Sequence, residues 1–293
     1  MWAMSEPAAS GAHAIPPARD AAPPTALTIA GSDSGGSAGL QADLRAFFAC
    51  GVHGMTAVTA VTVQNTVGVT GMHPIPPETV AAQIAAVAGD IGVGAAKTGV
   101  LASAATIRAV LGACDDQGIG RGGRTPFVVD PVAASRSGEP LLEPDALDAL
   151  RGEAFPRATL VTPNLDEVRL LTGVDARTRD DLRDAAKAVH EFGPEWVLIK
   201  SGHLPDDPEC VDLLFDGETA LPLTGPRYTT AHTHGAGDAF ASAITAALAR
   251  GASVPDAVRA GKRFVTRCVE HAYPLGAGVG PVSPFWRVAA DQW

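Results

Sequence analysis

Short apolar runs and helical stretches alternate along the chain from Leu27 onward. The runs are rich in β-branched residues, and the Ala-rich stretches between them carry apolar residues at helical spacing. This alternation is typical of βαβ units around a parallel sheet. Continuous apolar runs such as Phe127–Val129 suit strands that are covered on both faces. The pattern therefore predicts an α/β fold with helices on both sides of a central sheet.

The same pattern predicts the individual elements. The expected strands are Leu27–Ala30, Ala57–Val63, Phe127–Asp130, Thr159–Thr162 and Trp196–Lys200, then Val211–Phe215 and one near Leu221. The expected helices are Ala38–Cys50, Glu78–Gly89, Ala104–Gln117, Asp166–Leu171, Arg179–Glu191, Ala236–Ala249 and Val254–His271. The Gly- and Arg-rich segment Gly118–Thr125 is expected to be a surface loop.

The first residues differ in composition from the rest of the chain. Residues 1–25 contain five prolines among Ala, Ser and Gly. They lack the basic start and the apolar stretch of a signal peptide. We therefore expect a disordered tail over residues 1–25. No linker or internal repeat divides the remainder, so residues 26–293 are expected to form a single domain.

Charge and cysteine content narrow the possible functions. The 22 Lys and Arg against 32 Asp and Glu give a net charge of −10, which opposes binding to nucleic acid and anionic lipid. No apolar run approaches the ~20 residues of a membrane span. The four cysteines are widely spaced, without a C-x-x-C, which favours reduced thiols over a disulfide framework or a zinc site. Reduced thiols and no export signal indicate a cytoplasmic protein.

Polar residues gather where the predicted strands end. Ligands of open α/β sheets bind beyond the carboxyl ends of the strands. The segments at these ends are Gly31–Gly36, Gln64–Thr66, Lys97–Gly99, Asp130–Pro131, Thr162–Asn164 with Glu167, Lys200–His203 and Thr233–Asp238. Acids, amides, a lysine and glycine-rich turns at one edge predict a site that handles phosphate.

The segment Thr233–Asp238 is the most informative of these. Gly235, Ala236 and Gly237 open a long Ala-rich helix, so exposed amides and the helix dipole would form an anion cradle. Asp238 would lie in the first turn beside it. The alternative is an ordinary glycine turn followed by an acid that the helix dipole favours.

Two acids follow different strands. Asp130 and Glu167 are hard oxygen ligands that could both reach one Mg²⁺, as in phosphoryl transfer. Glu167 also stands three residues after Asn164, the spacing of a capping box. The two roles of Glu167 are compatible.

A lysine and an amide stand at two other strand ends. Lys200 would neutralise phosphate, or it is a strand-end lysine whose stem is buried. The amide of Gln64 would read a ring nitrogen and an amino group together, or it is a strand-end polar residue with its hydrogen bonds satisfied.

The other motifs give weaker evidence of function. Gly35–Gly39 fits the G-x-S-x-G of a hydrolase elbow, but several loop residues separate it from the preceding strand. A P-loop is absent, and no G-x-G-x-x-G follows a predicted strand and opens a helix, which is the context of the dinucleotide fingerprint. The histidines lack metal spacing, and we expect His232 and His234 to be loop residues.

Several of these segments, in this order, resemble the hydroxymethylpyrimidine/phosphomethylpyrimidine kinases of thiamine biosynthesis. The resemblance covers about Ala26 to Pro284. The segments that carry it are Thr28–Gly36, Ala38–Asp43, Val63–Thr66, Ala96–Gly99, Val129–Val132, Thr162–Glu167, Lys200–His203 and Ala272–Gly276.

The resemblance implies a ribokinase-like fold, with a central, mostly parallel sheet flanked by helices on both faces. It implies ATP- and Mg²⁺-dependent phosphorylation of 4-amino-5-hydroxymethyl-2-methylpyrimidine and then of its monophosphate to the diphosphate. Homodimers are common in this family, so a homodimer is expected. The partners would be the pyrimidine and ATP.

The resemblance also implies roles for individual residues. The pyrimidine would contact Gln64, Asp43, Gly31 and Val100. ATP and its phosphates would contact Lys200, Asn164, Thr233 and the lid residue Arg136. The metal would be held by Asp130 and Glu167, and catalysis would use Gly235, Ala236, Gly237 and the base Asp238.

Two positions depart from the family pattern. Many members carry G-T-G-C where this chain has Gly235–Asp238, so the usual base, a Cys, is an Asp here, as in the wider sugar-kinase pattern. Val100 replaces a common Met, which changes the substrate pocket by about one side chain.

Two alternatives stay open. One is a pyridoxal/pyridoxine kinase of the same fold, which acts on another hydroxymethylated ring. The other is a binding protein that has lost catalysis. The presence together of four candidate catalytic residues argues against it: Asp130, Glu167, Lys200 and Asp238.

Overall fold

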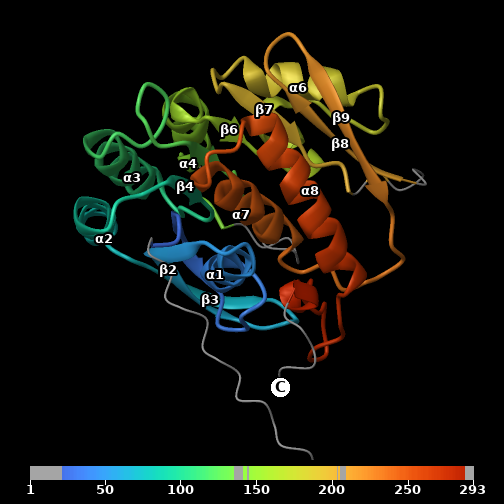
Figure 1. Cartoon of the computed structure of the whole chain (residues 1–293), viewed down its shortest axis with the longest axis horizontal. Helices are drawn as coiled ribbons and strands as arrows, with labels where there is room; N and C mark the ends of the chain where they lie inside the picture. Colours follow the sequence, from blue (N-terminus) through green and yellow to red (C-terminus); the bar gives the residue numbers. More distant parts are fainter. Residues whose placement is uncertain (1–21, 135–140, 144, 203, 205–208, 288–293) are drawn as a thin grey trace, which may run out of the picture.

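A computed structural model describes residues 22–134, 141–143, 145–202, 204 and 209–287 (Figure 1). Nine strands in this part of the chain form one sheet. In order across it they are β3 (Val69–Pro74), β2 (His53–Gln64), β1 (Thr25–Ser32), β4 (Ala95–Thr98), β5 (Phe127–Val129), β6 (Leu160–Val161), β7 (Trp196–Ile199), β8 (Glu209–Phe215) and β9 (Ala220–Pro226). The sheet is parallel from β2 to β7 and antiparallel where β3, β8 and β9 join its edges.

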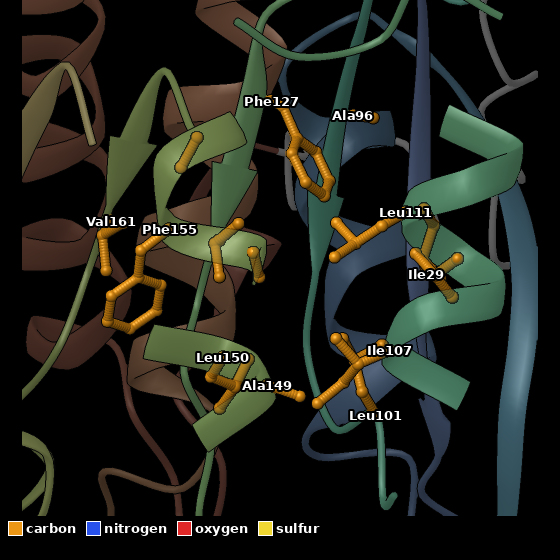
Figure 2. Packing of buried hydrophobic residues seen from close by; sticks show 14 of the residues in the cluster. Ile29, Ala96, Leu101, Ile107, Leu111, Phe127, Ala149, Leu150, Phe155 and Val161 are labelled. Atoms are coloured by element: carbon orange, nitrogen blue, oxygen red, sulfur yellow. The ribbon is translucent and has the colours of Figure 1, made fainter. Parts of the chain in front are cut away.

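Helices cover both faces of this sheet. They are α1 (Gly39–Ala49), α2 (Pro77–Asp90), α3 (Ala104–Asp116), α4 (Ala146–Ala149), α5 (Leu165–Thr172), α6 (Leu182–His190), α7 (Ala236–Ala249) and α8 (Val254–Glu270). Alternate residues of β5 show the two layers. Phe127 and Val129 belong to a core cluster with residues of α2 to α6, whereas Val128 packs with α7 and α8. Figure 2 shows part of the first cluster, with Phe127 near Leu111 of α3. Helix α1 lies on the same face as α7. The predicted α/β class is confirmed.

All of the predicted helices and strands are present, with ends displaced by a few residues. Two strands and one α-helix were missed. Strand β3 is mostly exposed and offers no continuous buried face, and β4 is fully buried but contains Lys97. Helix α4 has only four residues and continues into tighter and wider turns over Leu150–Arg157.

Most of the predicted tail lies outside the described residues. Residues 1–21 lie outside the described part. Strand β1 begins at Thr25, which pairs with His53, and the carbonyl of Pro24 accepts from the His53 amide at 2.8 Å. The tail predicted over residues 1–25 therefore extends too far at Pro24 and Thr25, and over residues 1–21 it stays a prediction. Among the described residues, we find no helix with the length and apolar character that a membrane crossing requires.

The topology decides where a ligand can bind. Strands β2, β1, β4, β5, β6 and β7 run in the same direction, so their carboxyl ends meet at one edge. At this edge β2 continues past β1 and pairs with β3 to form a two-stranded flap. Loops that follow the parallel strands and the start of α7 therefore converge in one place.

Candidate active site

A cavity of about 720 Å³ lies along this edge of the sheet. Its wall combines the ends of β1, β2, β5 and β7 with the first turns of α5 and α7. The predicted site residues that line it are Gly31, Gln64, Val100, Asp130, Asn164, Glu167, Lys200, Thr233, Gly235, Ala236, Gly237 and Asp238. The structure therefore brings most of the predicted site together.

Helix α7 begins at the cavity with free backbone amides. Gly235 precedes it with φ of +76°, and a Cβ there would lie 2.0 Å from the carbonyl oxygen of Ser37, so glycine is required. Within the described part of the chain, no side chain caps the helix, and the amides of Gly237 and Asp238 have no acceptor. Such amides attract an anion. The geometry is that of the expected cradle.

Asp238 lies half-buried in the first turn of α7. Burial raises the pKa of its carboxyl group, and the charge of Asp43 and then of Asp130 raises it further. Lys97 and His234 oppose them, and the resulting pKa is about 6. A carboxylate of this pKa is mostly ionised at neutral pH and is a better proton acceptor than an ordinary aspartate.

A buried ion pair lies at the ends of β5 and β7. Lys200 Nζ donates to Asp130 Oδ1 at 2.8 Å, and Thr162 Oγ1 donates to the same oxygen at 2.9 Å. Burial alone would lower the pKa of Lys200, but Asp130 and Glu167 raise it to about 12. Lys200 is therefore a permanent cation in the wall. A Cβ on Gly237 would lie 3.4 Å from its Nζ, so it also reaches the start of α7.

Asn164 and Glu167 form the capping box at the start of α5. Asn164 Oδ1 accepts from the Glu167 amide at 2.9 Å, and Glu167 Oε2 accepts from the Asn164 amide at 2.8 Å. Both residues also line the cavity, so the cap and a role in the site coexist. Burial raises the pKa of Glu167 to about 7, Asp130 adds to the rise, and Lys200 opposes it.

The donor set near Asp130 and Glu167 fits Mg²⁺. Among the described residues, there is no cluster of three or more His, Cys, Asp or Glu side chains that could bind a metal ion by itself. Two carboxylates are nevertheless enough, because Mg²⁺ in kinases is bound by one or two carboxylates and completed by substrate phosphates and water.

The other end of the cavity is less charged. Gln64 ends β2, and its Oε1 lies 3.2 Å from Thr62 Oγ1. Gly31 and Val100 form an adjacent patch of the same wall, since a Cβ on Gly31 would lie 3.8 Å from the Cβ of Val100. The carbonyl of Val100 is fixed by Thr59 Oγ1 at 2.6 Å. This end suits a flat ring with one polar edge.

Two predicted positions are not found in the cavity. Asp43 is fully buried behind the wall, where it accepts from Lys97 Nζ at 2.8 Å, Thr28 Oγ1 at 2.6 Å and Ser242 Oγ at 2.6 Å. It is a structural anion that joins α1 to β1, β4 and α7, so its expected contact with the pyrimidine is a misplacement. Arg136 lies outside the described residues.

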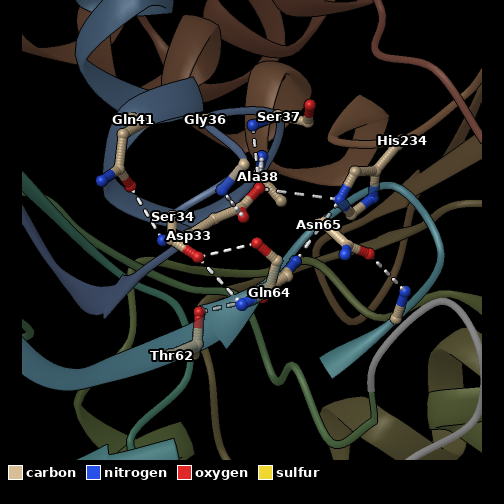
Figure 3. A network of polar contacts seen from close by, with 12 residues as sticks. Asp33, Ser34, Gly36, Ser37, Ala38, Gln41, Thr62, Gln64, Asn65 and His234 are labelled. Carbon is tan, nitrogen blue, oxygen red and sulfur yellow. Dashed lines mark hydrogen bonds and ion pairs between the residues drawn. The ribbon is translucent and has the colours of Figure 1, made fainter. Parts of the chain in front are cut away.

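The prediction also missed Asp33 and did not give His234 a role. Both line the cavity. Asp33 accepts from the amides of Gly35, Ser37 and Ala38, each at 2.8 Å (Figure 3). The sequence signal for Asp33 is the polar segment Gly31–Gly36 after β1, but this pattern does not show which of its side chains enter the cavity.

Together these features define a class of protein. A mostly parallel sheet carries, at its carboxyl edge, helix amides, a basic carboxylate, two further acids and a lysine in one cavity. This arrangement is that of a kinase with a ribokinase-like fold, in which charge stabilisation and positioning do most of the work of phosphoryl transfer.

The chain belongs to the phosphomethylpyrimidine kinase family, whose sequence model matches residues 33–283. It is 54% identical to the hydroxymethylpyrimidine/phosphomethylpyrimidine kinase of Mycobacterium tuberculosis, over 91% of this chain and 96% of that one. The family resemblance noted in the sequence is confirmed.

Solved structures agree on the fold. The pyridoxal kinase of Staphylococcus aureus in complex with AMP-PCP and pyridoxal superposes with a TM-score of 0.81 at 33% identity, covering 90% of this chain and 94% of that one. A phosphomethylpyrimidine kinase from Clostridium difficile superposes with a TM-score of 0.71 at 35% identity, covering 83% and 97%.

Proposed function

We propose that this chain uses ATP to phosphorylate 4-amino-5-hydroxymethyl-2-methylpyrimidine and then phosphorylates the monophosphate to the diphosphate, in thiamine biosynthesis. The observation that carries the proposal is the position of Asp238 and the free amides of α7 in the wall of a single cavity. Gln64 lines this cavity at the β2 end, and Lys200 lines it at the β7 end. An alcohol and a triphosphate can therefore meet at the start of α7.

The ring would be held at the β2 end. The amide of Gln64 pairs with the ring nitrogen and the amino group, while Gly31 and Val100 contact the ring itself. A pair of hydrogen bonds to one edge fixes the rotation of the ring in its plane. That orientation directs the hydroxymethyl group to Asp238.

The transfer would be carried out at the start of α7. Asp238 takes the proton of the hydroxyl group as the hydroxyl oxygen attacks the γ-phosphorus. The bond between the γ-phosphorus and the bridging oxygen breaks, and ADP leaves. The amides of Gly237 and Asp238 stabilise the charge on the transferring group. Lys200 neutralises the phosphates of ATP from the β7 end of the cavity, and Asn164 and Thr233 are further phosphate contacts.

The two remaining acids would serve the metal. Asp130 and Glu167 would hold Mg²⁺, which would offset the charge of the phosphates. Asp130 is paired with Lys200 at 2.8 Å. Glu167 must give up its proton before it can act as a ligand, because its pKa is about 7.

A second function is supported by a separate observation. The S. aureus pyridoxal kinase superposes with a higher TM-score, 0.81, than the C. difficile phosphomethylpyrimidine kinase, 0.71, so pyridoxal or pyridoxine is the alternative acceptor. The deciding experiment supplies ATP with each alcohol in turn and measures ADP release. A larger kcat/KM for the pyrimidine supports the proposal, and a larger value for pyridoxal or pyridoxine replaces it. No ADP release with any acceptor would indicate a binding protein.

Gln64→Leu is expected to raise KM for the pyrimidine far more than KM for ATP. The substitution leaves the ring donor and acceptor unpaired in a desolvated pocket, at about 1–3 kcal/mol each. Steady-state kinetics with each substrate varied in turn provide the test. Equal changes in the two KM values would show that Gln64 does not read the ring.

The rate of the alcohol step should fall as the pH drops below about 7. Both acids have pKa values raised by burial, Glu167 to about 7 and Asp238 to about 6. Each therefore gains a proton as the pH falls through its own value, and each must be ionised to act. A profile of kcat/KM from about pH 5 to 9 should show this loss on its acid side. A flat profile down to pH 5 would contradict these roles.

We also propose that the chain acts in the cytoplasm as a homodimer. The outer face of the flap supports a dimer, because Val61, Val63 and Val67 are 46%, 64% and 65% exposed. Paired copies of such a face bury it in an isologous contact. Sedimentation should give the mass of a dimer for the natural chain and of a monomer for Val63→Lys. A monomeric natural chain would refute the proposal.

A further inference from the structure

His234 stands in the cavity wall between two polar side chains. Its Nε2 lies 3.4 Å from Nε2 of Gln64 and 3.7 Å from Oδ2 of Asp33 (Figure 3). Its backbone is fixed from behind, because its amide donates to Gly280 at 3.2 Å and its carbonyl accepts from Val282 at 3.0 Å. The imidazole is therefore held in one place against both side chains.

Asp33 decides which ring nitrogen of His234 carries a proton. Burial would raise the pKa of Asp33, but the contact with His234 and the hydrogen bonds from three backbone amides lower it overall. Asp33 is thus an anion at neutral pH. A carboxylate opposite a ring nitrogen favours a proton on that nitrogen, so Nε2 of His234 is a donor.

A donor at this point constrains the amide of Gln64. Two nitrogens that both carry protons repel each other, and a half-turn about the last torsion of Gln64 exchanges its nitrogen and oxygen. On the other side of the amide, Thr62 Oγ1 gives its one hydrogen to the carbonyl of Ser32 at 2.7 Å. It can therefore accept from an amide N–H. All partners are satisfied when the oxygen of Gln64 faces His234 and its nitrogen faces Thr62.

We propose that His234 is a specificity-determining positioning residue, which holds the Gln64 amide with its oxygen on the side of Asp238 and its nitrogen on the side of Thr62. This inference rests on the proposed function. In the pyrimidine, the amino group lies between the ring nitrogen and the carbon that bears the hydroxymethyl group. The amide oxygen then accepts from the amine, the amide nitrogen donates to the ring, and the hydroxyl group extends toward Asp238.

The arrangement discriminates between closely similar rings. The 4-oxo analogue carries a carbonyl in place of the amine and an N–H in place of the free ring nitrogen. Its donors and acceptors are reversed, so a fixed amide places its oxygen against the carbonyl and its N–H against the ring N–H. An amide that is free to turn would accept either ring. Discrimination between these two compounds therefore reports on His234 directly.

The test is calorimetric measurement of Kd for both compounds without ATP. The natural chain should prefer the amino compound, and His234→Leu should reduce the ratio of the two Kd values by about tenfold or more, because the amide is released. His232→Leu is the control, since His232 accepts from Gly280 at 3.0 Å in the same loop but does not line the cavity. It should keep the natural ratio.

Damage to the fold would weaken both ligands together and leave the ratio unchanged. If His234→Leu does not fold, His234→Phe gives the same test, because it keeps an aromatic ring of similar shape and removes the N–H donor. An unchanged ratio in the variant that folds would overturn the role of His234. Failure of the natural chain to bind the amino compound would instead overturn the proposed function, and this inference with it.

Discussion

Asp238→Asn should lower kcat for the hydroxymethylpyrimidine by about 10²-fold or more and kcat for the monophosphate by much less. An alcohol must lose a proton during attack, whereas a phosphate monoester has a second pKa of about 6 and is mostly dianionic at pH 7.5. The carboxylate thus helps the first reaction and repels the second acceptor. The amides at the start of α7 serve both reactions. Steady-state kinetics with ADP detection measure the two rates.

Two measurements on Asp238→Asn control for damage to the fold: its Tm and the ratio of its two rates. Because burial raises the pKa of Asp238 above its unfolded value, its charge destabilises the folded state once the pH exceeds that raised pKa. Removing the charge should therefore leave Tm at pH 8 unchanged or higher. The ratio of the two rates is also independent of the fraction of active enzyme. Equal losses in both reactions would mean that Asp238 acts through the metal or the loop geometry, and not as a base.

Lys97→Met should lower the free energy of unfolding by about 3–5 kcal/mol, the usual cost of leaving a buried charge without its partner. Lys97 and Asp43 are both fully buried, with Nζ 2.8 Å from the carboxylate. In a chain of this size the loss corresponds to a fall in Tm of about 10 °C. Thermal and denaturant unfolding followed by circular dichroism provide the measurement.

The double variant Lys97→Met/Asp43→Asn is the matched comparison. It removes both charges while keeping both side chains close to their natural size, so it should recover most of the lost stability. Thr28 and Ser242 can still bond to the amide. A double variant as unstable as Lys97→Met alone would show that packing, and not the unpaired charge, causes the loss.

Local signals in the sequence account for most of the fold. The start of α7 at Ala236 was predicted to the residue, because a glycine turn precedes a long Ala-rich run. Strand β4 was missed since Lys97 interrupts its apolar pattern, and the reason for a buried lysine there is Asp43 on α1. A contact between distant segments leaves no mark on local periodicity.

The site shows the same contrast between residues that local signals identify and residues whose roles depend on contacts between distant segments. The rule that ligands bind beyond the strand ends collected Gln64, Asp130 and Lys200 from three separate segments. The role of Asp43 was misplaced because a motif identifies a neighbourhood and not the direction of a side chain. The contact of His234 with Asp33 depends on how two loops meet, so no pattern along the chain could reveal it.

The central claim is that one cavity performs two successive phosphoryl transfers to one pyrimidine. The most direct test is ³¹P NMR of the purified chain with the hydroxymethylpyrimidine, Mg²⁺ and excess ATP. The account predicts a monoester resonance that appears first and is then replaced by the paired resonances of a diphosphate ester. A reaction that stops at the monoester, or one that proceeds only with pyridoxal or pyridoxine as acceptor, would contradict it.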